Sequence, residues 1–384
     1  MKKIFCKIFL CVFLAFFLSG CANKDDRTVI KFSSWGSKSE IDIIKPIIAE
    51  FEAENSDVKV EFMHIPQNYF QKIHLLFASN TPPDVIFINN LYLPIYANAG
   101  VLEPVSDWAD LSLYENNVLA SLSWKSDIYA VPRDVSNLVI FYNKDLFDKF
   151  GIKYPDKNWT YKDLIEIGEK FKQNGVFAIS FEEAPLFFLP YLMSEGGGIV
   201  KNSEGELSIY GEASQRGLNF YSDLRKKYHI APYSEESASA TMAQMFLQQK
   251  LAMHLTGRWL VPKYREEANF NWDIVSFPNG SVGSIVPLDA SGWAVSNASK
   301  HKEEAHRFVN YLSSKSSIEK LTQCGLIVPA RKDVANSKYF LDGKNPHNAL
   351  VFLDVIKSAQ PTPVPVNYNE ILDNLSNYFE EKFN

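Results

Sequence analysis

Cysteine is scarce in this chain, which has four among 384 residues. Cys6, Cys11 and Cys21 all lie in the first 21 residues, so only Cys324 remains in the rest of the chain. A single thiol there excludes an intrachain disulfide, a cysteine metal cluster and a CxxC redox pair. Because apolar residues lie close to Cys324, we expect it to be a small buried hydrophobic residue.

Long hydrophobic runs are also absent, apart from Ile8–Leu18. Its 11 residues are too few to span a bilayer, which takes about 20 in a helix. Three lysines precede the run and small residues follow it, the pattern of a secretory signal peptide over residues 1–20. The letters L-S-G-C resemble the lipobox of bacterial lipoproteins, which implies lipidation of Cys21, followed by a polar tether at 21–27. The alternative is an ordinary signal peptide with a chance cysteine.

Basic excess and catalytic motifs are missing as well. Loss of residues 1–20 removes three lysines and no acid, which takes the net charge from −6 to −9 and argues against nucleic-acid binding. The sequence has no H-E-x-x-H motif, no G-x-S-x-G elbow and no P-loop lysine. We therefore expect no enzyme activity, no cofactor and no metal. A secreted glycosidase with two carboxylates facing across a cleft stays open as an alternative.

The length of the chain favours two domains, because one core seldom serves 384 residues. Strand patterns alternate with amphipathic helix patterns along both halves, which predicts an α/β fold with sheets covered by helices. The expected strands are 28–34, 58–62, 83–88, 138–142, 177–181, 251–255, 273–277 and 292–296.

Residues 127–146 have the pattern of a segment in which the chain crosses from one globular unit to another. An apolar piece ends at Pro132, which has no N–H to donate to a sheet, and a buried strand pattern follows at 138–142. The mostly polar residues between them predict a hinge. Asn143 is placed to cap the next helix and Gly151 to end it.

Ten short segments stand in a consistent order along the chain. They are F-S-S-W-G (32–36), P-D-V-I (83–86), A-G-V-L-E-P (99–104), V-P-R-D-V-S-N-L-V-I-F-Y-N-K-D-L-F (131–147), N-W-T (158–160), L-A-M-H-L-T-G-R-W (251–259), F-P-N-G (277–280), S-G-W-A-V-S (291–296), E-E-A-H-R-F-V-N-Y-L (303–312) and V-P-A-R (328–331). In order and spacing they resemble the bacterial extracellular solute-binding proteins, family 1, which deliver mostly sugars to ABC importers. Arg133 departs from the pattern, since an aromatic or small residue is commoner there.

This resemblance implies a two-lobed clamp of the type II periplasmic-binding-protein kind, each lobe being a sheet flanked by helices. The first lobe would combine 28–132 with 279–325 and the second 136–275 with 328–384, joined by hinges at 133–135, 276–278 and 326–327. Such a protein would capture a sugar or oligosaccharide in the cleft and close over it. Its partners would be the permease subunits of an ABC importer, and it would be an extracytoplasmic monomer anchored to a bacterial membrane by lipid on Cys21.

Loops at the expected carboxyl ends of the strands mix aromatic residues with Asn, Asp, Glu and Arg, a composition that matches the apolar faces and hydroxyls of sugars. Core packing is the alternative for a tryptophan there, a helix N-terminus for Glu40 and a surface charge for Arg331. The candidate ligand-binding residues, some of them at positions that the resemblance implies, are Trp35, Glu40, Asn89, Asn90, Tyr92, Asp134, Trp259, Asp289, Trp293 and Arg331.

Two further alternatives stay open at this point. One is a receptor of the same fold for a non-sugar solute such as glycerol phosphate, a polyamine or a peptide. Arg133, Arg258 and Arg331 would favour an anion, whereas cleft carboxylates unmatched by arginine would favour a cation. The other is an orphan lipoprotein that acts as a sensor or adhesin.

Overall fold

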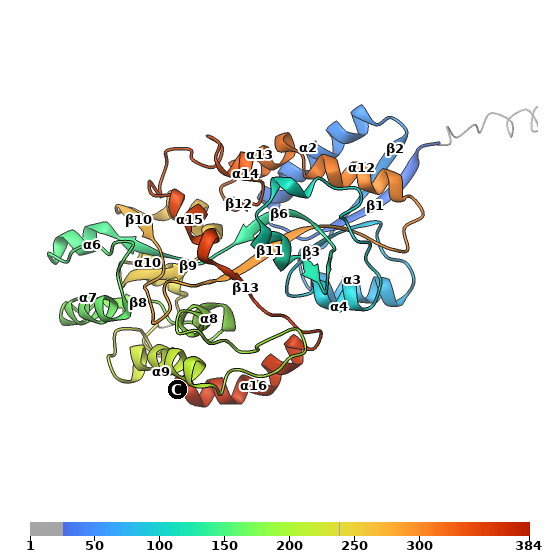
Figure 1. Ribbon diagram of the computed structural model, residues 1–384. Helices are drawn as coiled ribbons and strands as arrows, with labels where there is room; N and C mark the ends of the chain where they lie inside the picture. The colour runs from blue at the N-terminus through green and yellow to red at the C-terminus, as the bar shows by residue number, and fades with distance from the viewer. Residues whose placement is uncertain (1–25, 238) are drawn as a thin grey trace, which may run out of the picture.

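The computed structural model describes residues 26–237 and 239–384, which form two lobes, each built on its own sheet (Figure 1). The expected α/β architecture is thereby confirmed. The predicted signal peptide, Cys21 and residues 22–25 of the tether lie outside the described residues. Within the described part of the chain, no helix is both long and apolar enough to cross a membrane.

The first lobe is organised by a sheet of seven strands. These are β1 (Thr28–Ser34), β2 (Val58–His64), β3 (Val85–Asn89), β6 (Val131–Ser136), β11 (Pro287–Val295), β12 (Val328–Pro329) and β13 (Gln360–Pro361). The order is β12-β6-β11-β3-β1-β2, with β13 paired to β11. Because β1, β2 and β3 are parallel and β11 lies antiparallel between β3 and β6, the carboxyl ends of β1, β2, β3 and β6 share one edge with the start of β11.

The second lobe has a smaller sheet in the order β10-β7-β9-β8. Its strands are β7 (Val139–Asn143), β8 (Phe177–Ile179), β9 (Leu251–Thr256) and β10 (Trp272–Val275). A separate hairpin, β4 (Ser123–Trp124) with β5 (Asp127–Ile128), precedes β6. The expected strands at 138–142 and 251–255 are thus confirmed to within a residue.

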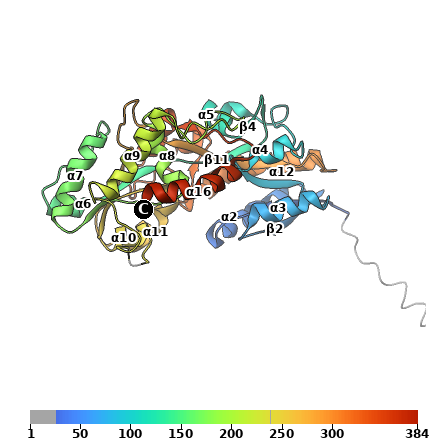
Figure 2. The same ribbon diagram turned by 90° about the horizontal axis from the view of Figure 1, so that it is seen from below.

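Helices cover both sheets. Those on or near the first sheet are α2 (Lys38–Glu54), α3 (Tyr69–Ala78), α4 (Leu93–Asn98), η1 (Leu111–Leu113), α5 (Asn116–Ser121), α12 (Lys302–Leu312), α13 (Lys315–Gln323) and α14 (Lys332–Ala335). The others are α6 (Lys144–Lys149), α7 (Tyr161–Gln173), α8 (Pro185–Met193), α9 (Glu212–Lys226), α10 (Met242–Leu247), η2 (Arg258–Leu260), α11 (Val261–Glu267), α15 (Leu350–Ser358) and α16 (Tyr368–Phe383). Seen from below, α16 lies beside α9 under the molecule (Figure 2).

Local sequence signals agree with the helix ends. Asn143 accepts a hydrogen bond from the Leu146 amide at 3.0 Å and so caps α6, as expected. Gly151 follows the end of α6 with φ of +64°, a conformation that glycine adopts at little cost. The expected capping box of Thr160 and Asp163 is also present at the start of α7.

The prediction that Pro132 ends a strand is wrong, because β6 runs unbroken from Val131 to Ser136. Pro132 faces Gly292 at the point where the register between β6 and β11 shifts. A β-bulge needs no donor from that position, and proline is tolerated there. Residues 133–135, expected to form a hinge, therefore belong to the ladder of the first sheet. Val328–Pro329, expected in the second lobe, also pairs with β6.

Candidate functional site

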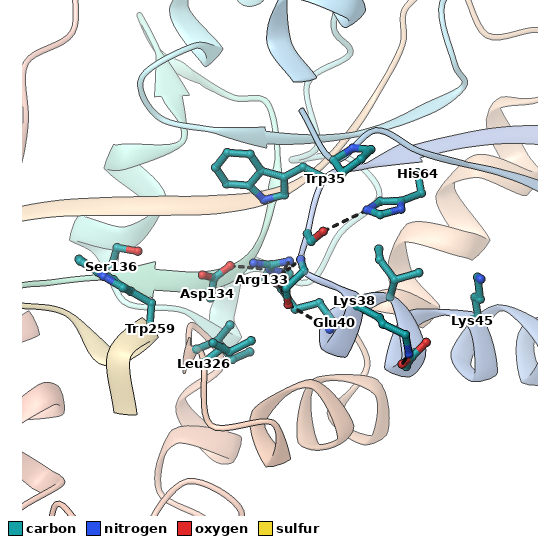
Figure 3. Close-up of a pocket in the computed structure, with 16 residues that line it drawn as sticks. Trp35, Lys38, Glu40, Lys45, His64, Arg133, Asp134, Ser136, Trp259 and Leu326 are labelled. Carbon is teal, nitrogen blue, oxygen red and sulfur yellow. Dashed lines mark hydrogen bonds and ion pairs between the residues drawn. The ribbon is translucent and has the colours of Figure 1, made fainter. Parts of the chain in front are cut away.

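A cavity of about 820 Å³ opens at the shared strand edge of the first sheet and reaches the second lobe (Figure 3). Its walls come from the ends of β1 and β2, the start of α2, β6, η2 and the segment before β12. The lining residues are Trp35, Gly36, Ser37, Lys38, Glu40, Ile41, Asp42, Lys45, His64, Pro66, Arg133, Asp134, Ser136, Trp259, Leu326 and Ile327. We call this space the cleft cavity.

Trp35 forms an aromatic wall of the cleft cavity. It follows β1 directly, and 38% of its surface is exposed. Its ring stacks on Phe87 of β3, with centroids 5.1 Å apart and planes at 27°, and it also contacts Phe70. Because packed rings support one face, Trp35 presents the rest of its indole to the cavity as a fixed plate.

A buried ion network lies on the same side. Arg133 donates from Nε to Asp134 Oδ1 at 2.6 Å, and its Nη1 lies 3.5 Å from Glu40 Oε1. The guanidinium also lies over the rings of Phe87 and Trp293. Burial alone would lower the pKa of Arg133, but the charges of Asp134 and Glu40 outweigh burial and hold that pKa above its ordinary value. Arg133 is therefore charged at any physiological pH.

Both carboxylates of the network are held by further bonds. Asp134 Oδ1 also accepts a hydrogen bond from the Ser291 hydroxyl of β11. Glu40 Oε2 accepts from the Ser37 amide at 2.9 Å and completes the capping box of α2. Glu40 therefore stabilises the start of α2, which was the alternative to a ligand-binding role, and it also lies on the cavity wall.

The second lobe contributes Trp259 to the cleft cavity. It lies in η2, which Gly257 separates from β9, and its ring folds back over Gly257. A Cβ at Gly257 would lie only 1.9 Å from the ring, so the absence of a side chain there permits this orientation. Trp35 and Trp259 thus line one cavity from different lobes.

A second polar group lies where β3 ends and β11 begins. Asn90 donates from Nδ2 to Asp289 Oδ1 at 2.8 Å and accepts from the Ala290 amide at 3.2 Å. Burial raises the pKa of the Asp289 carboxyl to about 6, although donation by Asn90 opposes the shift. Next to them, the Tyr92 amide donates to Asn89 Oδ1 at 3.2 Å, and the Tyr92 ring stacks on Phe70.

The sequence model of the bacterial extracellular solute-binding proteins matches residues 37–318. The chain belongs to this family. Members are binding proteins that work outside the cytoplasm, as the family's description states.

Curated relatives match this solute-binding protein over most of its length. The galactooligosaccharide-binding protein of Bacillus subtilis is 24% identical over 95% of this chain and 89% of its own length. The multiple sugar-binding protein of Streptococcus mutans is 25% identical over 78% of this chain and 74% of its own length.

Solved structures agree with the fold. The ABC substrate-binding protein Lmo0181 from Listeria monocytogenes, in complex with cycloalternan, has a TM-score of 0.82 and 25% identity, over 93% of this chain and 94% of that one. The sugar-binding protein MalE from Xanthomonas citri has a TM-score of 0.82 at 20% identity, over 92% of this chain and 91% of that one. This agreement along both chains confirms the two-lobed clamp.

The structure of this solute-binding protein sorts the ten candidate residues into two groups of four and two single residues. Trp35, Glu40, Asp134 and Trp259 line the cleft cavity, whereas Asn89, Asn90, Tyr92 and Asp289 form the second polar group. Trp293 is fully buried against Phe32 and Phe87. Arg331 donates to Asp333 and to the Ser313 carbonyl, away from the cavity.

The sequence analysis missed the contributions of His64, Leu326 and Ile327 to the cavity. His64 ends β2, and one of its ring nitrogens lies 3.0 Å from the Gly36 carbonyl oxygen. The signal that could have found it is the parallel arrangement of β1 and β2, which brings their carboxyl ends together. Leu326 and Ile327 are placed by the pairing of β12 with β6, for which the sequence carries no local signal.

Metal binding has no support in the described residues, where no three His, Cys, Asp or Glu side chains are arranged to hold an ion.

Proposed function

We propose that this solute-binding protein captures a sugar or oligosaccharide between its lobes and delivers it to the membrane subunits of an ABC importer. The observation that carries the proposal is the pairing of Trp35 and Trp259, from different lobes, on one cavity with the acidic group of Asp134. Sugar rings present apolar C–H faces flanked by hydroxyls. Aromatic plates with a few fixed polar partners therefore match them. The curated relatives named for sugars support the same ligand class.

Capture would work by closure of the lobes. Among the described residues on the cavity wall, Trp259 is the one that follows a strand of the second sheet. A ligand held first by the first lobe would gain contacts with the second lobe only when the lobes approach. Such contacts stabilise the closed arrangement of the lobes by the difference in ligand-binding free energy between the closed and the open arrangement.

We place the hinge where the chain changes sheets. Between β6 and β7 only Asn137 and Leu138 intervene, which supports a position just after the expected 133–135. The other expected hinges, 276–278 and 326–327, fall in the connections between β10 and β11 and just before β12. In the lobe division expected from the sequence, 328–384 does not lie wholly with the second lobe, because β12 and β13 pair with strands of the first sheet. The rest of that division remains part of this proposal.

A ligand titration tests the proposal. Purified residues 22–384 are titrated with a glycan panel by calorimetry and tryptophan fluorescence, with glycerol phosphate, spermidine and short peptides as the non-sugar set. We expect at least one glycan to bind and to be recovered chemically unchanged. Binding of the non-sugar set alone would contradict the sugar assignment, and turnover of the bound glycan would indicate a glycosidase.

Matched tryptophan variants locate the site. Trp35→Ala and Trp259→Ala are expected to weaken glycan binding about tenfold or more, since each removes a stacking surface. Trp108→Phe is the control, because Trp108 stacks on His306 away from the cavity. Equal affinities for all three variants would place the ligand elsewhere. Scattering profiles that do not change with bound glycan would contradict closure.

The membrane anchor is a separate part of the proposal, and it rests on the sequence. Lipid on Cys21 would hold the protein at the outer side of a bacterial membrane, next to the permease. Full-length chain should fractionate with membranes, and Cys21→Ser should release it. Light scattering of the soluble part should give the mass of a monomer. Membrane-bound Cys21→Ser would exclude the lipid anchor.

A further inference from the structure

A second cavity lies on the face of β6 opposite the cleft cavity. Its volume is about 700 Å³, within the range of about 300–1,000 Å³ in which proteins bind small molecules. Val135 of β6 lines this second cavity, whereas Asp134 and Ser136 line the cleft cavity, because successive side chains of a strand point to opposite faces. We call the second space the rear cavity.

The walls of the rear cavity come from both lobes. α5, β12, α14 and β13 belong to the first lobe, and α15 belongs to the second. Ser121 of α5 donates from its hydroxyl to the Leu288 carbonyl of β11 at 3.1 Å. The Phe352 ring of α15 lies against Phe141 of β7, with centroids 6.3 Å apart. The rear cavity therefore spans the hinge proposed between β6 and β7, and its shape depends on how the lobes are placed.

The inner surface of the rear cavity is largely apolar. Val118 of α5 and Leu353 and Ile356 of α15 line it from opposite walls. Leu350 lines it as well and is 52% exposed. A ligand with an apolar body would cover this surface and remove it from water.

The charged residues of the rear cavity leave one cation unmatched. Lys357 Nζ lies 2.7 Å from Asp354 Oδ1, and Glu115 interacts electrostatically with the same lysine. Lys332 of α14 is the fourth charged residue of the lining, and its ammonium has no bonding partner within residues 26–237 and 239–384. A ligand that complements this lining carries one negative charge at the end of an apolar body.

We propose that the rear cavity binds an amphiphilic carboxylate, such as the anion of a medium-chain fatty acid, and that this ligand opposes closure of the cleft. A rotation about Asn137 and Leu138 that narrows the cleft on one face of β6 separates α5 from α15 on the other face. A ligand that touches both walls would lose contacts in that movement, so it favours the arrangement described here. The site is independent of the proposed function, whereas its effect on glycan binding rests on that function.

Probes with the same apolar chain and different head groups test the ligand class. Residues 22–384 are titrated by calorimetry with decanoate, decan-1-ol and decylammonium, each below the concentration at which it forms micelles. We expect one decanoate per chain, bound about fivefold or more tightly than decylammonium. Lys332→Gln should weaken decanoate binding about threefold and leave decan-1-ol unchanged. Leu350→Gln should weaken both about threefold.

Two control variants locate the bound decanoate. Lys338→Gln removes the same charge from an exposed lysine outside the rear cavity, so decanoate binding should not change. Trp259→Ala alters the cleft cavity and should also leave decanoate binding unchanged. The positions of Lys332 and Leu350 are exposed, so both substitutions are expected to fold, which circular dichroism checks.

A second set of titrations measures the coupling between the two cavities. The best glycan of the panel is titrated with and without saturating decanoate. Glycan affinity should fall about fivefold or more in decanoate, and decanoate affinity should fall by the same factor when the glycan is saturating. Lys338→Gln should show the same coupling as the unaltered protein.

The remaining outcomes contradict the inference in separate ways. Absence of decanoate binding, or binding that responds to Trp259→Ala and not to Lys332→Gln or Leu350→Gln, overturns the site. Unchanged or tighter glycan binding in decanoate overturns the opposition to closure. Flotation of residues 22–384 with phosphatidylglycerol vesicles, lost in Lys332→Gln, would assign this lysine to a membrane surface and overturn the proposal. If no glycan binds, the proposed function fails, and the decanoate titrations still decide the site.

Discussion

Two tryptophans on the same aromatic layer are expected to respond to mutation in opposite ways. Trp35 and Trp293 both contact Phe87, but Trp35 is 38% exposed on the cavity and Trp293 is fully buried. Truncation of a buried aromatic residue to alanine removes its packing and leaves a cavity. Trp293→Ala should therefore lower the free energy of unfolding by about 3–5 kcal/mol.

The indole nitrogen of Trp293 gives a second prediction, for the substitution to phenylalanine. Its Nε1 has no hydrogen-bond partner within the described residues, so Trp293→Phe loses part of a ring and no hydrogen bond. The Trp293→Phe substitution should lower the free energy of unfolding by about 1 kcal/mol. Trp35→Ala should cost about 1 kcal/mol or less, because much of its ring already faces the cavity. Trp35→Ala should instead weaken the free energy of glycan binding by roughly 1.5–3 kcal/mol, which is about a tenfold to hundredfold loss of affinity.

Urea denaturation followed by circular dichroism gives the unfolding energies, and calorimetry with the best glycan of the panel gives the affinities. Trp293→Phe should bind that glycan within about threefold of the unaltered protein. A Trp293→Phe variant of normal stability that no longer binds would make Trp293 a ligand contact, as the sequence resemblance implies, and would refute its place in the core. A Trp35→Ala variant that loses stability and keeps its affinity for the glycan would contradict the role of Trp35 as a ligand contact.

Three more predictions concern single groups. Burial raises the pKa of Asp289 to about 6, above its unfolded value of 3.8, so its stabilising contribution is complete below pH 3.8 and is lost as pH rises through 6. Asp289→Asn should therefore gain stability relative to the unaltered protein between pH 4 and 7, by about 2 kcal/mol or less in parallel urea titrations, and a pH-independent difference would exclude the shift. Burial lowers the pKa of His254 to about 3, so the unfolded state takes up a proton first and stability should fall as pH drops below 6.5. His254→Gln should flatten that part of the pH profile, and an unchanged slope would contradict a buried neutral imidazole. A Cβ at Gly292 would lie 2.3 Å from the Val131 carbonyl oxygen, so Gly292→Ala should separate β6 from β11, cost about 1–3 kcal/mol and weaken glycan binding, whereas a fully stable variant would contradict this close approach.

The alternation of strands and helices was readable from the sequence because each element has its own periodicity of buried residues. Caps such as Asn143 and the Thr160–Asp163 box are local, since the atoms that bond lie within three residues. The order of the ten segments indicated the family. The strand-end rule located Trp35 after β1 and Trp259 after β9, whereas Asp134 lies within β6.

Tertiary structure alone decided which of those strand-end residues face the cavity. Trp293 has the same local sequence signals as a cleft residue, but β11 lies between β3 and β6 and turns that side chain into the core. Pro132 lies within a strand because Gly292, 160 residues further along the chain, provides a bulge opposite it. Arg133 acquires a second ion-pair partner from Glu40, which lies on α2, 93 residues earlier in the chain. Pairings between segments so distant in sequence depend on sheet order, which the residues of either segment do not encode locally.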